Sequence, residues 1–105
     1  MPLAYEADQS ANGSTVVLAA GQALLIELSE NPTTGYRWGM QPCSGMRLDE
    51  NTFSPGGGGI GASGIRRLKL SATATGAHRL TLLQCREWEP ASKFIARFDL
   101  TVVSS

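Results

Sequence analysis

Apolar and polar residues alternate with a period of two along most of this chain, and almost no stretch has the spacing of a helix. The segment from residue 93 to residue 103 is an example, because apolar residues occupy every even position from 94 to 102. Such alternation puts one set of side chains on each face of a strand, so that one face packs on a core while the other meets water. The chain is therefore predicted to be all-β.

Seven segments have this strand pattern, and turn-forming pairs such as Thr75-Gly76 separate several of them. Their predicted ranges are 14–19, 22–28, 36–40, 47–53, 65–73, 77–84 and 93–103. Seven half-buried antiparallel strands in about 100 residues indicate an immunoglobulin-like sandwich of two sheets. A partly open barrel is the main alternative. The predicted inward positions are Leu24, Ile26, Leu28, Leu68, Leu70, Ala72, Leu80, Leu82, Phe94, Ala96, Phe98, Leu100 and Val102.

The 105 residues are predicted to form a single domain, residues 1–105, with a loosely ordered N-terminal segment over residues 1–12. Hydrophobic residues make up 42% of the chain and charged residues 17%, which is typical of a folded protein rather than a disordered one. The formal net charge is zero, so no basic excess favours nucleic acid or an anionic membrane as a partner. No apolar run approaches the roughly 20 residues that a membrane span needs.

The first residues of the chain lack the basic start and the apolar stretch of a signal peptide. Two localisations therefore stay open. The protein is cytoplasmic as written, or it is periplasmic or secreted and its leader was removed.

The two cysteines, Cys43 and Cys85, fit neither a C-x-x-C pair nor a zinc pattern, and no residue pattern indicates a metal or a cofactor. In the predicted sandwich Cys85 ends the sixth strand, whereas Cys43 follows the third strand and lies on the order of 20 Å from the start of that strand. A disulfide requires Cα atoms within about 7 Å of each other. We therefore expect two thiols and no bridge between them.

Three segments of turn-forming residues, 31–36, 56–64 and 86–90, fall between predicted strands two and three, four and five, and six and seven. In an immunoglobulin-like sandwich these connections are expected to form one continuous edge, which is typical of a binding surface. No group of catalytic residues accompanies them. His78 is the single histidine and lies in a strand away from Cys85, and no G-x-S-x-G motif is present. The chain is therefore not expected to be an enzyme.

Each segment also has a purely structural interpretation. Residues 59–64 match G-x-G-x-x-G, but a predicted strand follows where a dinucleotide site needs a helix, so we expect either a flexible connection or an adaptable binding loop. Pro32 and Gly35 predict a stiff turn whose threonines face either solvent or a narrow cleft. Trp38 lies in mid-strand and is expected in the core, whereas Trp88 lies on a charged loop and is expected to anchor an interface.

Taken together, these three segments resemble the chagasin family of small protein inhibitors of papain-like cysteine peptidases. Residues 31–38 match the family pattern N-P-T-T-G-[YF]-x-W in full. Residues 61–64 match G-x-G-G with Ser63 in place of a glycine, and residues 86–88 match R-x-W, with Glu87 where many members have proline. The similarity covers the chain from about Ser14 to the C-terminus.

The resemblance implies an immunoglobulin-like sandwich that inhibits papain-like peptidases reversibly, tightly and competitively. It implies that the loop with Thr33 and Thr34 enters the cleft over the enzyme's catalytic Cys and His, while the glycine loop and the Trp88 loop straddle that cleft. A monomer is expected in the free state. A non-inhibitory adhesion or carbohydrate-binding module and an enzyme of unknown chemistry remain the alternatives. The implied peptidase-binding residues are Asn31, Pro32, Thr33, Thr34, Gly35, Gly61, Ala62, Ser63, Gly64, Arg86 and Trp88.

Overall fold

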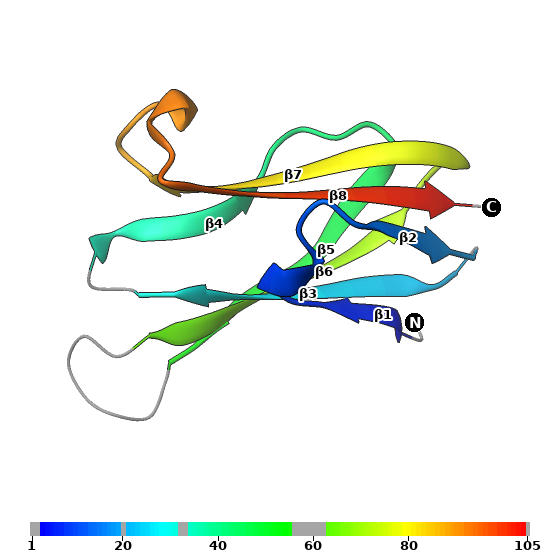
Figure 1. Cartoon of the computed structure of the whole chain (residues 1–105), viewed down its shortest axis with the longest axis horizontal. Helices are drawn as coiled ribbons and strands as arrows, with labels where there is room; N and C mark the ends of the chain where they lie inside the picture. Colours follow the sequence, from blue (N-terminus) through cyan, green and yellow to red (C-terminus); the bar gives the residue numbers. More distant parts are fainter. Residues whose placement is uncertain (1–2, 20, 32–33, 56–62, 105) are drawn as a thin grey trace.

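Two four-stranded sheets face each other across the core of the molecule (Figure 1). The computed structural model describes residues 3–19, 21–31, 34–55 and 63–104. One sheet consists, in order, of β1 (Leu3–Ala7), β3 (Ala23–Glu30), β6 (Gly64–Ala72) and β5 (Met46–Ser54). The other consists of β2 (Thr15–Leu18), β8 (Ala96–Ser104), β7 (Gly76–Arg86) and β4 (Tyr36–Met40). The described residues also form two 3-10 turns, η1 (Gln9–Ala11) and η3 (Ala91–Lys93), and contain no helix long and apolar enough to cross a membrane.

The predicted all-β, immunoglobulin-like sandwich is confirmed, and the main difference is an additional strand at the N-terminus. β1 lies parallel to the edge of β3, with Tyr5 opposite Leu24 and Ala7 opposite Ile26. Residues 3–11 therefore form a strand and a turn, where the sequence predicts a loosely ordered segment. The five residues of β1 are extended because they pair with β3, a strand further along the chain. Such a pairing cannot be predicted from the residues of β1 alone.

Two of the strand pairings are parallel, whereas the sequence prediction has every strand antiparallel. They join β1 to β3 and β2 to β8. β1 and β2 are edge strands of the two sheets and contact each other, and η1 lies between them in the chain. The N-terminal part of the chain thus closes one side of the sandwich.

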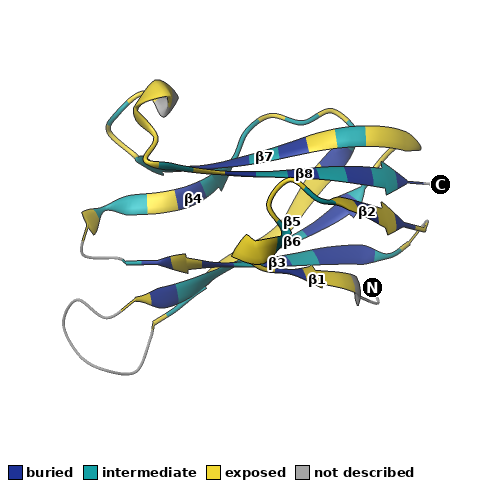
Figure 2. Cartoon of the chain, in the orientation of Figure 1, coloured by how far each residue is buried: buried dark blue, intermediate teal, exposed yellow. Residues whose placement is uncertain are grey.

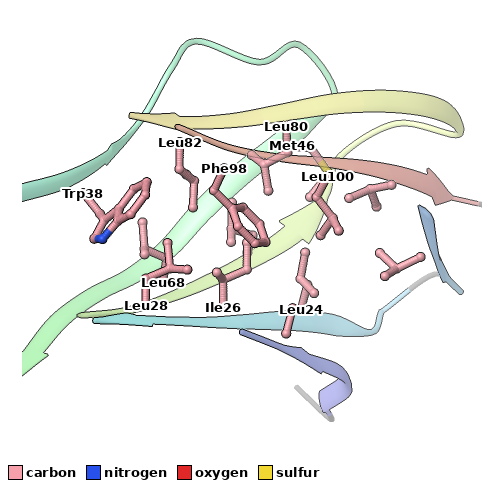
Figure 3. Close-up of a cluster of buried hydrophobic side chains, with 14 of the residues drawn as sticks. Leu24, Ile26, Leu28, Trp38, Met46, Leu68, Leu80, Leu82, Phe98 and Leu100 are labelled. Atoms are coloured by element: carbon pink, nitrogen blue, oxygen red, sulfur yellow. The ribbon is translucent and has the colours of Figure 1, made fainter. Parts of the chain in front are cut away.

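Alternation of side chains between core and solvent builds the hydrophobic core, as the sequence predicts (Figures 2 and 3). Trp38 of β4 lies at one end of this core and is 4% exposed, which confirms its expected role. Burial of apolar surface at about 25 cal/mol per Å² is the main term that stabilises such a domain. The predicted inward residues that are buried are Leu24, Ile26, Leu28, Leu68, Leu70, Leu80, Leu82, Phe98, Leu100 and Val102.

Phe94 is the clear exception to the predicted core. Its side chain is 41% exposed, because residues 91–93 form η3 and β8 begins only at Ala96. Ala72 and Ala96 are partly buried against the core. Leu83 is buried as well as its neighbour Leu82, so burial along β7 does not alternate strictly.

Cys43 and Cys85 lie toward opposite ends of β7 and are not joined by a disulfide. The Sγ atom of Cys43 donates a hydrogen bond to the carbonyl oxygen of Arg79, 3.3 Å away, near the start of that strand. Cys85 lies near the end of the same strand, opposite Arg37 of β4. The stretch of strand from Arg79 to Cys85 spans on the order of 20 Å, far beyond the reach of a disulfide. The expectation of two thiols without a bridge is therefore confirmed.

Alkylation of the unfolded protein without reductant should label both cysteines, and mass spectrometry checks this. Labelling of the native protein near neutral pH should be slower. Burial raises the pKa of both thiols, and Glu89 raises that of Cys85 further, so each thiol holds less reactive thiolate than an unperturbed cysteine. A protected pair in the unfolded protein would contradict the strand order described above.

Replacing Trp38 with alanine should destabilise the domain by about 3–5 kcal/mol, because it empties a large buried site and removes the indole hydrogen bond to Ser29. Chemical denaturation followed by circular dichroism measures the loss. Val17→Thr is the control, since Val17 is 67% exposed and this change keeps a branched side chain in β2. The control should stay within about 0.5 kcal/mol of the parent protein.

Candidate functional site

One end of the sandwich, here called the loop end, is where three strands finish and the next three begin (Figure 1). The strands that finish there are β3, β5 and β7, and the strands that begin there are β4, β6 and β8. In the first sheet Glu30 of β3 pairs with Gly64 of β6, and the end of β5 pairs with the start of β6 as well. In the second sheet Tyr36 of β4 pairs with Arg86 of β7. The three connections that carry the predicted binding residues therefore leave the scaffold at one end, as expected from the sequence.

The structure places seven of the eleven predicted binding residues. Pro32, Thr33, Gly61 and Ala62 lie outside the described residues. The seven that it places are Asn31, Thr34, Gly35, Ser63, Gly64, Arg86 and Trp88.

A buried carboxylate holds the two sheets together beneath the first of these connections. Glu30, the last residue of β3, is 2% exposed, and its Oε1 atom accepts a hydrogen bond of 2.7 Å from the backbone N–H of Trp38. Arg66 of β6 donates to both carboxylate oxygens, at 3.2 Å from Nε and 2.7 Å from Nη2. A buried charge is tolerated when it is paired and hydrogen-bonded in this way. The end of β3 and the start of β6 are thus tied to β4 in the opposite sheet.

The first loop, residues 31–35, is closed by the hydroxyl group of Thr34. This hydroxyl donates to the carbonyl oxygen of Asn31 at 3.0 Å and accepts from the backbone N–H of Tyr36 at 3.3 Å. Gly35 follows with φ of +79°, the positive value that its place before β4 predicts. The hydroxyl of Thr34 is therefore used to shape the turn.

Arg86, the last residue of β7, connects the first loop to the residues that follow β7. Its Nε atom donates to the carbonyl oxygen of Thr34 at 3.2 Å. Its guanidinium lies 4.3 Å from the centroid of the Tyr36 ring and 5.8 Å from that of Trp88, both within cation–π range. The Nη1 atom of Arg86 lies 3.4 Å from Oε1 of Glu89. The sequence pattern predicts Arg86 as a binding residue, and in the structure its contacts join the first loop to the residues that follow β7.

Trp88 is 71% exposed and lies against the first loop. A Cβ atom added to Gly35 would lie 2.7 Å from the ring atom Cη2 of Trp88, so the indole edge rests on the glycine backbone. The loop that carries Trp88, residues 87–95, is itself held by the backbone bonds Glu89 N to Arg86 O (3.1 Å) and Lys93 N to Pro90 O (2.9 Å). The indole is therefore presented to solvent from an organised support, which confirms its expected surface position.

Ser63 and Gly64 end the glycine-rich connection between β5 and β6. Ser63 is exposed, and Gly64 is buried as the first residue of β6. A Cβ atom at Gly64 would collide with the backbone oxygen of Ser54 and come within 2.5 Å of the Phe53 ring. Packing of β6 against β5 therefore accounts for the glycine at this position.

The described residues offer no arrangement for catalysis or metal binding. They contain no group of three or more His, Cys, Asp or Glu side chains that could hold a metal ion. His78 lies against Gly45 with its Nε2 atom 2.8 Å from the carbonyl oxygen of Ala74, far along β7 from Cys85. A shallow hollow of about 300 Å³ beside β4 and β7 is lined by Cys85, Leu83, Gly39, Arg37, Glu87 and Glu89, with no histidine to activate the thiol.

Sequence reasoning missed Tyr36 and Glu89 as partners of Arg86, and Glu30 and Arg66 beneath the first loop. Tyr36 was recognised as part of a motif, but its ring had no assigned contact. The buried ion pair joins residues that are 36 positions apart in the chain. A glutamate at the end of an otherwise apolar strand face was the one local sign of it, since Glu30 continues the inward series Leu24, Ile26 and Leu28.

The sequence model of the chagasin family of peptidase inhibitors, I42, matches residues 17–102. Chagasin of Trypanosoma cruzi is 30% identical over 105 residues, which is 93% of this chain and 96% of chagasin. The crystal structure of EhICP2, a cysteine protease inhibitor from Entamoeba histolytica, superposes with a TM-score of 0.82 at 20% identity, and covers 97% of this chain and 98% of that one. PbICP-C, solved in complex with falcipain-2, superposes with a TM-score of 0.63 at 17% identity, over 99% and 92% of the two chains.

Replacing Gly35 with alanine should displace the Trp88 indole, because the new Cβ atom would lie 2.7 Å from its ring. Gly21→Ala is the matched control, since Gly21 has φ of +80° and open space around it. Both variants should lose about 1–2 kcal/mol of stability from the left-handed backbone, but only Gly35→Ala should shift the indole N–H resonance of Trp88 in a ¹H–¹⁵N spectrum. An unmoved resonance would show that the two loops do not touch.

Proposed function

The chain belongs to the chagasin family of peptidase inhibitors, and on this basis we propose that it blocks the cleft of papain-like cysteine peptidases with the three connections of its loop end. Thr33 and Thr34 of the first loop enter the cleft over the catalytic Cys and His of the enzyme. Residues 61–64 and Trp88 contact the cleft on either side. The whole chain, residues 1–105, acts as a single inhibitor domain.

One observation carries this proposal: Trp88 stays 71% exposed while its ring edge rests on Gly35. A large indole in water is unfavourable for a free protein, and exposed tryptophans are typical anchors of protein interfaces. Arg86 holds both loops in place, through the carbonyl of Thr34 and the ring of Trp88. The anchor and the loop that enters the cleft are therefore positioned together before the enzyme arrives.

This organisation favours tight binding because the ordering cost is met during folding. Immobilising a flexible side chain in an interface costs about 0.5–1.5 kcal/mol of conformational entropy, and a loop that is already ordered in the free protein avoids part of that cost. An inhibitor complex of ordinary size buries about 800 Å² on each partner, which a three-connection surface can supply. Thr34 donates to the carbonyl oxygen of Asn31 from both its N–H and its hydroxyl, which holds the two ends of the first loop together. In the proposed complex this loop presents no scissile bond in register with the catalytic thiolate.

A non-inhibitory adhesion or carbohydrate-binding module is the second candidate function. A carbohydrate site would also use an exposed aromatic ring, so Trp88 alone does not separate the two. The match of residues 17–102 to the chagasin family of peptidase inhibitors favours inhibition. Titration of papain with the purified protein separates the candidates: the proposal expects an increase in KM with unchanged kcat.

Trp88→Ala should weaken inhibition of papain by about 2 kcal/mol or more, because it removes the buried anchor of the complex. That is roughly thirtyfold in the inhibition constant. Thr33→Ala should cost less, since one hydroxyl forms one or two hydrogen bonds of about 1 kcal/mol each.

Neither change should lower the melting temperature much, whereas Trp38→Ala should lower it strongly through its buried indole. A Trp88→Ala protein that unfolds more easily and still inhibits at full strength would overturn the assignment of the anchor.

A further inference from the structure

Large exposed apolar side chains concentrate in the connection between β7 and β8. In the described part of the chain, the large hydrophobic residues classed as exposed are Tyr5, Val17, Leu48, Trp88, Phe94 and Ile95. Half of them lie in residues 88–95, and Figure 2 shows that much of this connection faces solvent. The family motif accounts for Trp88 and leaves Phe94 and Ile95 without a role.

Folding alone does not explain these two residues. Phe94 is 41% exposed and Ile95 is 58% exposed, although both directly precede the core strand β8. Their backbone is held in this arrangement, because the N–H of Ile95 donates to the carbonyl oxygen of Gln84 at 2.9 Å and η3 closes the turn before Phe94. Exposed apolar residues that gather in one connection of a folded protein typically mark an interaction site.

We propose that Phe94 and Ile95 form a second apolar contact with the target peptidase, on the wall of the enzyme that flanks the cleft beyond the Trp88 contact. This inference rests on the proposed function. The N–H of Ile95 donates a hydrogen bond to the carbonyl oxygen of Gln84, two residues before Arg86. Arg86 in turn donates a hydrogen bond to Thr34 of the first loop. An enzyme seated on the first loop and Trp88 therefore lies beside the rest of the same connection.

The neighbouring charges fit such an interface. Glu87 and Lys93 are exposed on the same connection and would form a polar rim around the apolar residues. A second copy of this chain is a poorer occupant, because it would also cover Trp88 and the first loop and so compete with the enzyme. The occupant is thus a papain-like peptidase with an apolar wall beside its cleft, and Phe94 and Ile95 select among such enzymes.

The test compares inhibition constants of the parent protein, Ile95→Thr, Phe94→Ser and the double variant against papain and several other papain-like peptidases. Val17→Thr is the matched control, since it replaces an exposed branched side chain on β2. The double variant should lose about tenfold in affinity toward at least one enzyme with an unchanged melting temperature, while the control keeps full inhibition. Ile95→Leu, which keeps the apolar area, should retain most of the affinity.

Inhibition by the double variant that stays within twofold of the parent protein against every enzyme would overturn the inference while leaving the proposed function intact. A loss that Ile95→Leu shares in full would also overturn it, because it would then come from the shape of the loop. A concentration-dependent dimer that the double variant abolishes would assign these residues to a second copy instead. A parent protein that inhibits none of the enzymes would instead remove the proposed function itself.

Discussion

The carboxylate of Glu30 is the interaction on which the loop end depends. It lies at the last position of β3, accepts from the backbone of Trp38 in the opposite sheet, and pairs with Arg66 of the neighbouring strand. Both side chains are largely buried, so loss of either partner leaves an uncompensated charge, at a cost of about 3–5 kcal/mol. Apolar packing holds two sheets together along their length but does not fix where one strand starts. The hydrogen bond from the Trp38 N–H to Glu30 fixes the start of β4 relative to the end of β3.

With that position set, Arg86 joins the first loop to the Trp88 loop. The charge of Arg86 is shared among a carbonyl oxygen, two aromatic rings and Glu89, all on residues of the loop end. None of these contacts is strong alone, since exposed ion pairs contribute about 1 kcal/mol or less. Their effect is geometric: they define one relative placement of two loops that the sequence separates by about 50 residues. Such placement reduces the ordering cost of binding, which is the main advantage open to an inhibitor that performs no chemistry.

The sequence predicts the sheets better than it predicts their edges. Period-two alternation located the core strands and separated the buried Trp38 from the exposed Trp88, because burial on one face leaves a local trace. β1 was missed because its conformation depends on pairing with β3, and both parallel pairings were missed for the same reason. Phe94 continued the apolar alternation of β8 and was placed in the core, yet η3 ends that alternation before the strand begins. Prediction thus failed where a distant partner or a turn decides the outcome.

The motifs that predicted the site combine residues of two kinds. Thr34, Gly64 and Arg86 are used within the fold: one closes a turn, one permits the approach of β5, and one braces two loops. Trp88, in contrast, leaves most of its surface in water. A sequence pattern cannot distinguish these roles, because both restrict the residue type at a position. A large apolar side chain that the free protein leaves in water points to binding, and in this respect Phe94 and Ile95 resemble Trp88 although no motif includes them.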